Sequence, residues 1–456
     1  MLPSYLKMAV PNPARNRAPW YKNTAPTYAG IFLWFVFWNK MPSGGSEAAG
    51  GVLGQGLVVA FLGLIIAALL CHFLFYLVPG LFGMKSGLPL YVVGSSTYGS
   101  RGGFLMPGFL MGVLQFGWLG VNAYFSSLAL APLFGNNPIV QQVIAVIWVI
   151  LAAFVGLKGI QYVAKIATLL PLIPLAILAI MLVKTLGGIG SFEAEKFVEA
   201  SAVESAKTAS LTFFGIIALS ITYIVGFFAT AGAAGVDFGM NSKDSRDVQM
   251  GGLFGITLAV IVAGGASILI AAGAFGAGIR AGVDTANPGF MSAVMGSPGA
   301  GKTMALLLAV AAFPPACFSS FIAANSFKTT LPKINPFISV GLGAAVSILL
   351  AVTGWAGKVI DVFTVIGAAF GPICGAMMVD YFLSGRKWAG PRVGWNLAGW
   401  ISWIVGFAVG IAPLVGLANI PAAPLMAFIV GAVLYAVLAK AGLEPKAVEI
   451  GSTEST

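Results

Sequence analysis

Long apolar runs separated by short polar connections dominate the chain. A helix needs about 20 apolar residues to cross the hydrocarbon core of a bilayer, and these runs are long enough. They lack the alternation of apolar and polar residues that marks the strands of a membrane barrel. The pattern therefore predicts an all-α polytopic membrane protein with about 12 transmembrane helices. The expected crossings are Thr27–Gly50, Val52–Met84, Gly103–Phe134, Ile139–Leu157, Gly159–Val183, Thr208–Asp237, Gly252–Gly278, Met304–Lys328, Phe337–Ala356, Val359–Phe382, Gly394–Gly416 and Ala422–Ala441.

Two of these crossings contain residues that interrupt a regular helix. The first carries the polar pair Asn39 and Lys40 followed by Pro42 and two glycines, and the sixth carries a glycine-rich run at residues 226–235 with Thr230 in its middle. Broken helix is tolerated in a membrane where it lines a cavity, and breaks at corresponding places in two halves of a transporter indicate its binding site. Close packing through small residues is the alternative explanation, above all for the sixth crossing.

The position of the two breaks, five crossings apart, suggests two inverted five-helix repeats within one membrane domain. We expect a cytoplasmic N-terminal tail (1–26), a transporter core (27–383, with repeats at about 27–185 and 208–383), two accessory helices (384–441) and a cytoplasmic C-terminal tail (442–456). Most of the 24 lysines and arginines lie on the side of the two tails. By the positive-inside rule, this predicts a multi-pass protein of the cell (inner) membrane with both termini in the cytoplasm.

Composition supports this class of protein and excludes others. Hydrophobic residues make up 59% of the chain and charged residues 8%, against about 25% charged in an average soluble domain. A soluble enzyme with this composition would lack the charged surface that it needs in water. The net charge of +10 comes from scattered bases, so no nucleic-acid partner is expected. The sequence contains no recognisable nucleophile–base pair or cluster of metal ligands, so it predicts neither an enzyme nor an organic cofactor.

Helical spacing places three polar or aromatic residues on one face of the third crossing. Gln115, Trp118 and Asn122 stand at i, i+3 and i+7. Such a face is poorly suited to lipid. It can form a ladder of hydrogen bonds between helices, or it can stack and hydrogen-bond a flat polar ligand. In the eighth crossing, Ser319 and Ser320 offer hydroxyls that suit Na⁺, although serines in membrane helices often bond their own backbone.

Three titratable residues within the apolar runs have open roles. Lys165 can extend to the cytoplasmic surface, occupy the place of a bound cation, or pair with an acid such as Asp237. Lys40 can face a ligand or point toward Glu47 in the outer vestibule. His72 is the sole histidine of the sequence and can be packed in the core or act as a proton relay.

Four stretches, in this order and spacing, resemble nucleobase–cation symporter family 1, whose members have a five-plus-five inverted-repeat transporter fold. They are Lys85–Gly99 after the second crossing, Gln115–Gly120, the glycine-interrupted run that ends at Asp237 and Phe238, and Gly371–Tyr381 followed by Arg386 and Lys387. The resemblance covers essentially the whole chain. It implies secondary active import of a purine, pyrimidine, hydantoin or allantoin-like ring by alternating access, coupled to Na⁺ or H⁺.

The same resemblance implies a substrate site. Family members hold the ring between an aromatic residue of the third crossing and one of the sixth, which here are Trp118 and Phe228, with Phe227 as the second choice. Positions that hydrogen-bond the ring match Gln115, Asn122 and Asn325, and Thr230 and Lys40 also stand beside the breaks. Cytosine-transporting relatives have an asparagine where this chain has Ala316, which argues against cytosine held in their manner.

A sodium site is implied in the same way. Its ligands would be the backbone carbonyls of Phe37 and of Leu33 or Trp34 one turn earlier, the carbonyl of Ala316, and the hydroxyls of Ser319 and Ser320. In some sodium-independent carriers with this overall fold, a lysine replaces the cation, and Lys165 is the candidate here.

Rival functions remain open at this stage. An amino-acid or other small-solute carrier of the same fold is the main one, and a passive channel or receptor is another. We expect the first, second, sixth and seventh crossings to move against the third, fourth, eighth and ninth. The expected partners are a small heterocycle and membrane lipid, and we expect a monomer or weak homo-oligomer.

Overall fold

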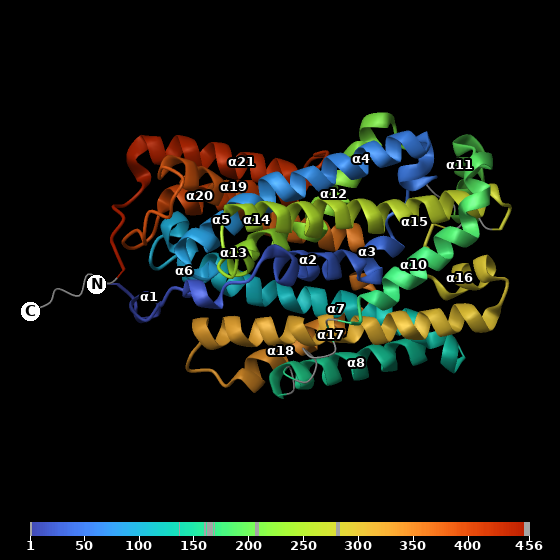
Figure 1. Cartoon of the computed structure of the whole chain (residues 1–456), viewed down its shortest axis with the longest axis horizontal. Coiled ribbons are helices and arrows are strands. Elements are labelled where there is room, and N and C mark those ends of the chain that lie inside the picture. The colour runs from blue at the N-terminus through green and yellow to red at the C-terminus, as the bar shows by residue number, and fades with distance from the viewer. Residues whose placement is uncertain are drawn as a thin grey trace, which may run out of the picture.

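The apolar runs of the sequence form a bundle of long helices in the computed structural model, which describes residues 2–135, 137–158, 161, 167, 169–205, 209–279 and 283–450. Figure 1 shows the long helices lying roughly side by side along the longest axis of the molecule. In lipid, a helix is the structure in which a single segment forms all of its backbone hydrogen bonds internally. Apolar runs of this length therefore form helices.

The first repeat begins after a short N-terminal segment. Its elements are α1 (Ser4–Lys7), η1 (Ala14–Asn16), η2 (Trp20–Lys22), α2 (Thr24–Leu33), α3 (Phe35–Asn39), η3 (Gly51–Gln55), α4 (Leu57–Leu70), η4 (Cys71–Tyr76), α5 (Leu77–Ser86), α6 (Leu90–Tyr98), η5 (Phe104–Phe109), α7 (Leu110–Leu130), η6 (Ala131–Phe134), α8 (Pro138–Lys158), α10 (Leu172–Thr185) and η7 (Leu186–Ser191).

The second repeat and the accessory helices follow a short outer helix, α11 (Ala194–Ser205). The elements are α12 (Phe213–Ala233), α13 (Gly235–Gly239), α14 (Ser245–Gly252), η8 (Leu253–Leu258), α15 (Ala259–Gly276), α16 (Pro288–Met295), α17 (Pro298–Thr330), α18 (Pro336–Val352), η9 (Trp355–Gly357), α19 (Val359–Leu383), α20 (Leu397–Ile411), α21 (Ala423–Leu438) and η10 (Ala439–Leu443).

Within these described ranges, nine helices are long and apolar enough to cross a membrane, and α18 and α20 are shorter apolar helices. The first crossing is divided between α2 and α3. Together these segments account for the twelve expected crossings and confirm the predicted all-α polytopic membrane fold. The fifth crossing is described from residue 169 onward, apart from the isolated residues 161 and 167, so Lys165 lies outside the described residues.

The break in the first crossing lies earlier than the sequence suggested. Trp34 separates α2 from α3 with an extended backbone (φ −59°, ψ 124°), whereas the Pro42–Gly45 turn only follows the end of α3 at Asn39. The carbonyl groups freed near the break have partners. Trp38 donates from its indole nitrogen to the carbonyl oxygen of Leu33 at 3.1 Å, and the Tyr223 hydroxyl donates to that of Phe37 at 2.6 Å. The break is therefore stabilised by Trp38 from within the crossing and by Tyr223 from α12, and not by the proline.

The sixth crossing is interrupted at Ala234, at the end of its glycine-rich run, and α12 is continuous before that residue. Glycines inside the run serve close packing. A β-carbon on Gly226 would lie 2.5 Å from the carbonyl oxygen of Phe363 in α19, and one on Gly232 would lie 2.9 Å from Phe75 in η4. Close packing, the alternative explanation, therefore applies to the glycines inside this run, and a role of the interruption at Ala234 in a binding site stays a prediction.

Buried apolar side chains form two large clusters that divide the helices into two bodies. One cluster joins α7, α8, α17 and α18, with residues such as Leu119, Val149, Cys317 and Val340. The larger cluster joins α2 to α5 with α12, α15 and α19, and it also includes residues of α7 and α17, such as Val121 and Met304, where the two bodies pack against each other. In Figure 1, α7, α8, α17 and α18 lie together below the other long helices. The first body contains the third, fourth, eighth and ninth crossings, and its movement against the other helices stays a prediction.

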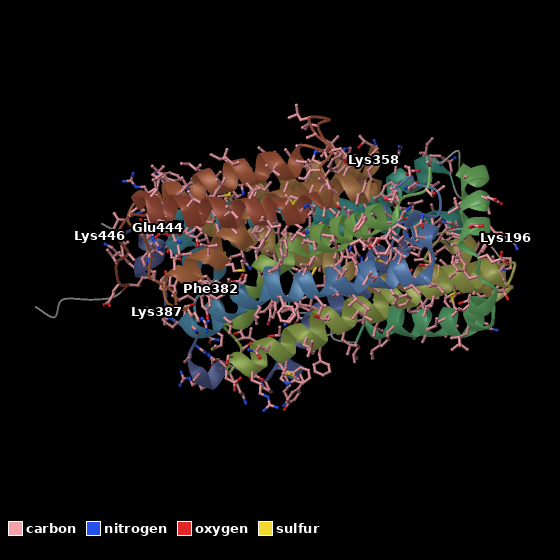
Figure 2. All side chains as sticks on the ribbon, turned by 90° about the horizontal axis from the view of Figure 1, so that it is seen from above. Lys196, Lys358, Phe382, Lys387, Glu444 and Lys446 are labelled. Carbon is pink, nitrogen blue, oxygen red and sulfur yellow. The ribbon has the colours of Figure 1, made fainter. Side chains whose placement is uncertain are left out.

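The cytoplasmic tails, as assigned by charge, meet at one end of the molecule. Arg392 pairs with Asp380 of α19 at 2.9 Å and with Glu444 of the C-terminal segment at 3.0 Å, while Tyr5 donates to the carbonyl oxygen of Ser100 at 2.7 Å. Figure 2 shows Glu444, Lys446, Phe382 and Lys387 at this end, opposite Lys196. Burial of the guanidinium group lowers the pKa of Arg392, but Asp380, Tyr435 and Glu444 raise that pKa by more, so Arg392 stays charged.

Candidate functional site

Trp118 projects from α7 toward three aromatic side chains of the other body. We call Trp34, Trp118, Phe227 and Phe363 the aromatic box. Its ring centroid lies 5.3 Å from that of Phe227 in an edge-on arrangement, 5.7 Å from that of Phe363 and 6.0 Å from that of Trp34. These distances are typical of aromatic contacts, which favour edge-on and offset packing. Trp118 therefore stands at the junction of the two bodies and beside the break in the first crossing.

The structure pairs Trp118 with Phe227 and not with Phe228. The Phe228 ring is fully buried and stacks on Phe32 of α2, with ring centroids 5.6 Å apart. Adjacent residues of a helix point about 100° apart, so both cannot face α7. This reverses the order of preference that the sequence suggested for the second ring-stacking residue.

Polar groups beside the aromatic box are few. The indole nitrogen of Trp118 donates to the hydroxyl oxygen of Thr230 at 3.2 Å, which joins the third crossing to the sixth. The Gln115 side chain is buried, and its amide nitrogen contacts the Met111 sulfur at 3.6 Å. Sulfur is a weak acceptor, so the Gln115 amide can exchange this contact for a stronger acceptor on a ligand.

Asn122 serves the packing of the first body. Its amide nitrogen donates to the carbonyl oxygen of Ala312 in α17 at 2.9 Å, and its oxygen accepts from the indole of Trp148 in α8 at 2.9 Å. Ala312 precedes two prolines at residues 314 and 315, where the backbone lacks donors. Of the two readings that the sequence left open for this residue, the hydrogen-bond ladder between helices is the one observed.

The expected sodium ligands lie on different interfaces in this structure. Ser320 is buried and faces α8, because a β-carbon on Gly156 would lie 2.8 Å from the β-carbon of Ser320. Its hydroxyl has no hydrogen-bond partner among the described residues. Ala316 is buried, Ser319 is half-buried, and the Phe37 carbonyl oxygen accepts from the hydroxyl of Tyr223 in α12. Whether these groups assemble around a cation stays a prediction.

Asn325 and Lys40 do not join the aromatic box. The Asn325 side chain is exposed. Lys40 forms an ion pair with Asp284, with 2.6 Å between the ammonium nitrogen and a carboxylate oxygen. Asp284 belongs to the connection between α15 and α16, and nothing in its sequence context marks it as a partner of Lys40. The expected orientation of Lys40 toward a ligand is therefore not the one observed.

The connection that carries Asp284 covers the outer end of α3. The side-chain oxygen of Asn39 accepts from the backbone nitrogen of Ala286 at 2.7 Å, and the Trp38 carbonyl oxygen accepts from the hydroxyls of Ser267 and Thr285. A cavity of about 80 Å³ remains beneath it. Its lining includes Phe35, Asn39, Lys40, Tyr124, Phe125, Leu128, Asp284 and Asn287. On the side assigned as outer, the polar contacts close the first crossing against this connection.

Two further candidates from the sequence are packed. His72 lies in η4 against Gly252, the last residue of α14, and its Nδ1 atom is buried without a partner among the described residues. The carboxylate of Asp237 accepts from the backbone nitrogen of Leu90, the first residue of α6, at 2.9 Å. In the described part of the chain, no three histidine, cysteine, aspartate or glutamate side chains are grouped to hold a metal ion.

Sequence reasoning missed three members of the site. Trp34 was considered for its backbone carbonyl only, and Phe363 and Asp284 were not considered. Trp34 carries a usable signal, since it is a tryptophan next to a predicted break. Phe363 has none, because its contact with Trp118 depends on how α19 packs against α7 and α12.

Comparison with solved structures shows which known folds this chain resembles. The inward-facing conformation of Mhp1 has a TM-score of 0.65 at 18% identity and covers 99% of this chain and 98% of its own. A second structure of Mhp1, which is described as a nucleobase-cation-symport-1 family transporter, shows a closed conformation with bromovinylhydantoin bound. It has a TM-score of 0.61 at 19% identity, and the match covers 95% of this chain and 94% of that one. A Na⁺-coupled sialic acid symporter scores 0.55 at 14% identity, with 95% and 92% covered.

At these identities the likeness shows the fold, which is that of polytopic solute transporters. A search of the curated proteins found no match. The family model for permeases for cytosine/purines, uracil, thiamine and allantoin matches residues 47–438. The chain belongs to this family of permeases. It is therefore a membrane transporter and not an enzyme, as the sequence predicted.

Proposed function

We propose that this protein imports a planar nitrogen heterocycle, such as a nucleobase, hydantoin or allantoin-like ring, by alternating access coupled to a cation. The observation that carries the proposal is the placement of Trp118. It extends from the helix group α7, α8, α17 and α18 into the aromatic box of the opposite group, beside the broken first crossing. A flat ring that separates Trp118 from Phe227 would contact both bodies at once.

Alternating access follows from this placement. A ligand shifts an equilibrium between two conformations only through its different affinity for each. A ring held between Trp118 on one body and Phe227 or Trp34 on the other gains or loses contacts when the bodies move apart. The ion pair of Lys40 with Asp284 closes the proposed outer end in the present arrangement, so entry of a substrate from outside requires this contact to open.

The polar groups favour a ring with both donors and acceptors. Gln115 offers an amide, and Thr230 offers a hydroxyl that already accepts from Trp118. Asn122 is committed to Ala312 and Trp148 and contributes to the scaffold. We propose Gln115, Trp118, Phe227 and Thr230 as the substrate-binding residues.

The coupling ion is proposed to bind at the eighth crossing, where the buried hydroxyl of Ser320 has no partner among the residues that the structure describes. A hydroxyl and freed carbonyl oxygens are the ligands that Na⁺ takes. A proton, or the ammonium group of Lys165, is the alternative occupant. Both termini are proposed to face the cytoplasm, as the positive-inside rule requires, which fusion of a topology reporter to either end would test.

Uptake by purified protein in liposomes tests the function. A panel of labelled purines, pyrimidines, hydantoins and allantoin is offered with an inward gradient of Na⁺ or of H⁺. We expect saturable uptake of at least one ring, and Trp118→Ala should weaken binding of that ring by about 5- to 150-fold because a base–aromatic stack contributes about 1–3 kcal/mol. Trp395→Ala is the matched control, since Trp395 is 43% exposed at the cytoplasmic end.

The proposal fails if no ring is transported, or if Trp118→Ala and Trp395→Ala transport equally well. Replacement of Na⁺ by choline separates the coupling ions. Equal uptake in both buffers would assign coupling to a proton or to Lys165.

A further inference from the structure

The indole of Trp34 is a polar group that the packing leaves unused. Trp34 occupies the break between α2 and α3, and its ring nitrogen is buried without a hydrogen-bond partner among the described residues. A buried donor left unpaired costs about 1–3 kcal/mol. Such groups are rare in folded proteins, so each one needs a physical explanation.

Other tryptophans of the bundle show that a partner is normally found. Trp38, four residues along, donates to the Leu33 carbonyl oxygen at 3.1 Å. Trp118 donates to Thr230 at 3.2 Å and Trp148 to Asn122 at 2.9 Å. The indole nitrogens of Trp388, Trp400 and Trp403 each reach a backbone carbonyl oxygen. Among the described residues, Trp34 is the one tryptophan whose indole nitrogen is buried and unpaired.

That position is the aromatic box. The Trp34 ring lies 6.0 Å from Trp118 at 68° and 6.2 Å from Phe227 at 32°, measured between ring centroids. A ligand that contacts Trp118 and Phe227 thus also meets Trp34. Because the break fixes the backbone at Trp34 and the neighbouring rings confine its side chain, the donor is held in place before any ligand binds.

We propose that the indole N–H of Trp34 donates a hydrogen bond to an acceptor on the edge of the transported ring, either a carbonyl oxygen or an unprotonated ring nitrogen. This inference rests on the proposed function and narrows its substrate class. A site built to hydrogen-bond a substrate group rejects analogues that lack it, because the buried partner is then left unpaired. Trp34 is therefore a specificity-determining residue.

The same bond links binding to movement. Trp34 belongs to the first crossing, whereas Trp118 belongs to the opposite body. A ring bonded to Trp34 and stacked on Trp118 favours the arrangement in which the two are close. Its affinity for that arrangement exceeds its affinity for one in which the first crossing has moved away, which is what alternating access requires.

The experiment removes the donor and the acceptor separately. Purified full-length protein is titrated by calorimetry with each transported ring, and then with deaza and thio analogues in which one acceptor at a time is deleted or weakened. In the wild-type protein, deletion of one particular acceptor should raise Kd about tenfold, as expected for the loss of one hydrogen bond in a buried site. If every analogue of a transported ring binds as tightly as the ring itself, the proposal is wrong.

The variant Trp34→Phe keeps an aromatic ring and removes the donor. It should bind the parent ring about tenfold more weakly and should no longer distinguish the parent from the critical analogue. Trp148→Phe, whose indole already has a partner in the scaffold, should retain the discrimination. Unchanged discrimination in Trp34→Phe would overturn the proposal. Should that variant not fold, the wild-type analogue series still decides.

The two proposals fail differently. If no ring of the panel binds or is transported, the proposed function itself is wrong. If rings are transported but the discrimination does not depend on Trp34, only the role of Trp34 is wrong.

Discussion

At the scale of single residues, glycines allow close packing between helices, and buried polar side chains form specific hydrogen bonds between helices. Gly226 lets α12 approach the backbone of α19 at Phe363, and this contact places Phe363 near Trp118. Asn122 satisfies a carbonyl group near a proline pair. The aromatic box therefore depends on residues that touch no ligand.

Gly226→Ala should destabilise the protein by about 1–3 kcal/mol, the usual cost of overpacking. Its β-carbon would lie 2.5 Å from the Phe363 carbonyl oxygen, a backbone atom that cannot move alone. Gly117→Ala is the control in α7, where a β-carbon meets nothing within 4 Å. It should leave stability unchanged or raise it, because alanine favours helix. Thermal unfolding of the purified protein measures both. Equal melting temperatures would contradict this account of the glycine-rich run.

At the scale of elements, the end of the first crossing and the connection between α15 and α16 form a closed contact on the side that we propose faces outward. Lys40 and Asp284 supply its charges, and Asn39, Ser267 and Thr285 supply hydrogen bonds to backbone. The ion pair is partly exposed, with 24% of the Lys40 side chain accessible. A pair of this kind contributes little to overall stability, yet it can bias two conformations that lie close in free energy.

Asp284→Asn should therefore shift the protein toward conformations open to the outside. A cysteine introduced as Leu128→Cys in the cavity below this contact should react faster with a membrane-impermeant maleimide. The native cysteines are all buried and give a low background. Glu193→Gln, which breaks the exposed pair of Glu193 with Lys196, is the matched control and should not change the rate. The gate assignment is rejected if Asp284→Asn labels no faster than the control.

At the scale of the whole molecule, two helix bodies meet at the aromatic box, and the accessory helices reinforce one of them. α21 packs against α19 and α20, and the network of Arg392, Asp380 and Glu444 ties these helices to the C-terminal segment. A buried ion pair is weak evidence for stability, but loss of one partner leaves an uncompensated charge.

Arg392→Met should lower the free energy of unfolding by about 3–5 kcal/mol, because Asp380 is buried and would lose its cation. The double variant Arg392→Met with Asp380→Leu should recover part of that loss, since both charges are then absent. Differential scanning calorimetry compares the three proteins. A single variant as stable as the wild type would show that the network does not hold the C-terminal segment.

The sequence by itself determined the class, the number of crossings and the family. Lipid excludes unpaired backbone groups, so an apolar run of about 20 residues has essentially one structure available, and this constraint is local. The sequence also placed Trp118 and Gln115 on one face of the third crossing, because helical spacing is a local property.

The tertiary structure alone decided which residues face Trp118. Phe227 and not Phe228 contacts Trp118, Lys40 forms an ion pair with Asp284, and Asn122 bonds to Trp148 within its own body. The break lies at Trp34, where Trp38 supports it from within the crossing and Tyr223 from α12, and not at the proline. These outcomes depend on contacts between helices distant in sequence. Such contacts follow from the shape of the whole bundle, which no single segment encodes.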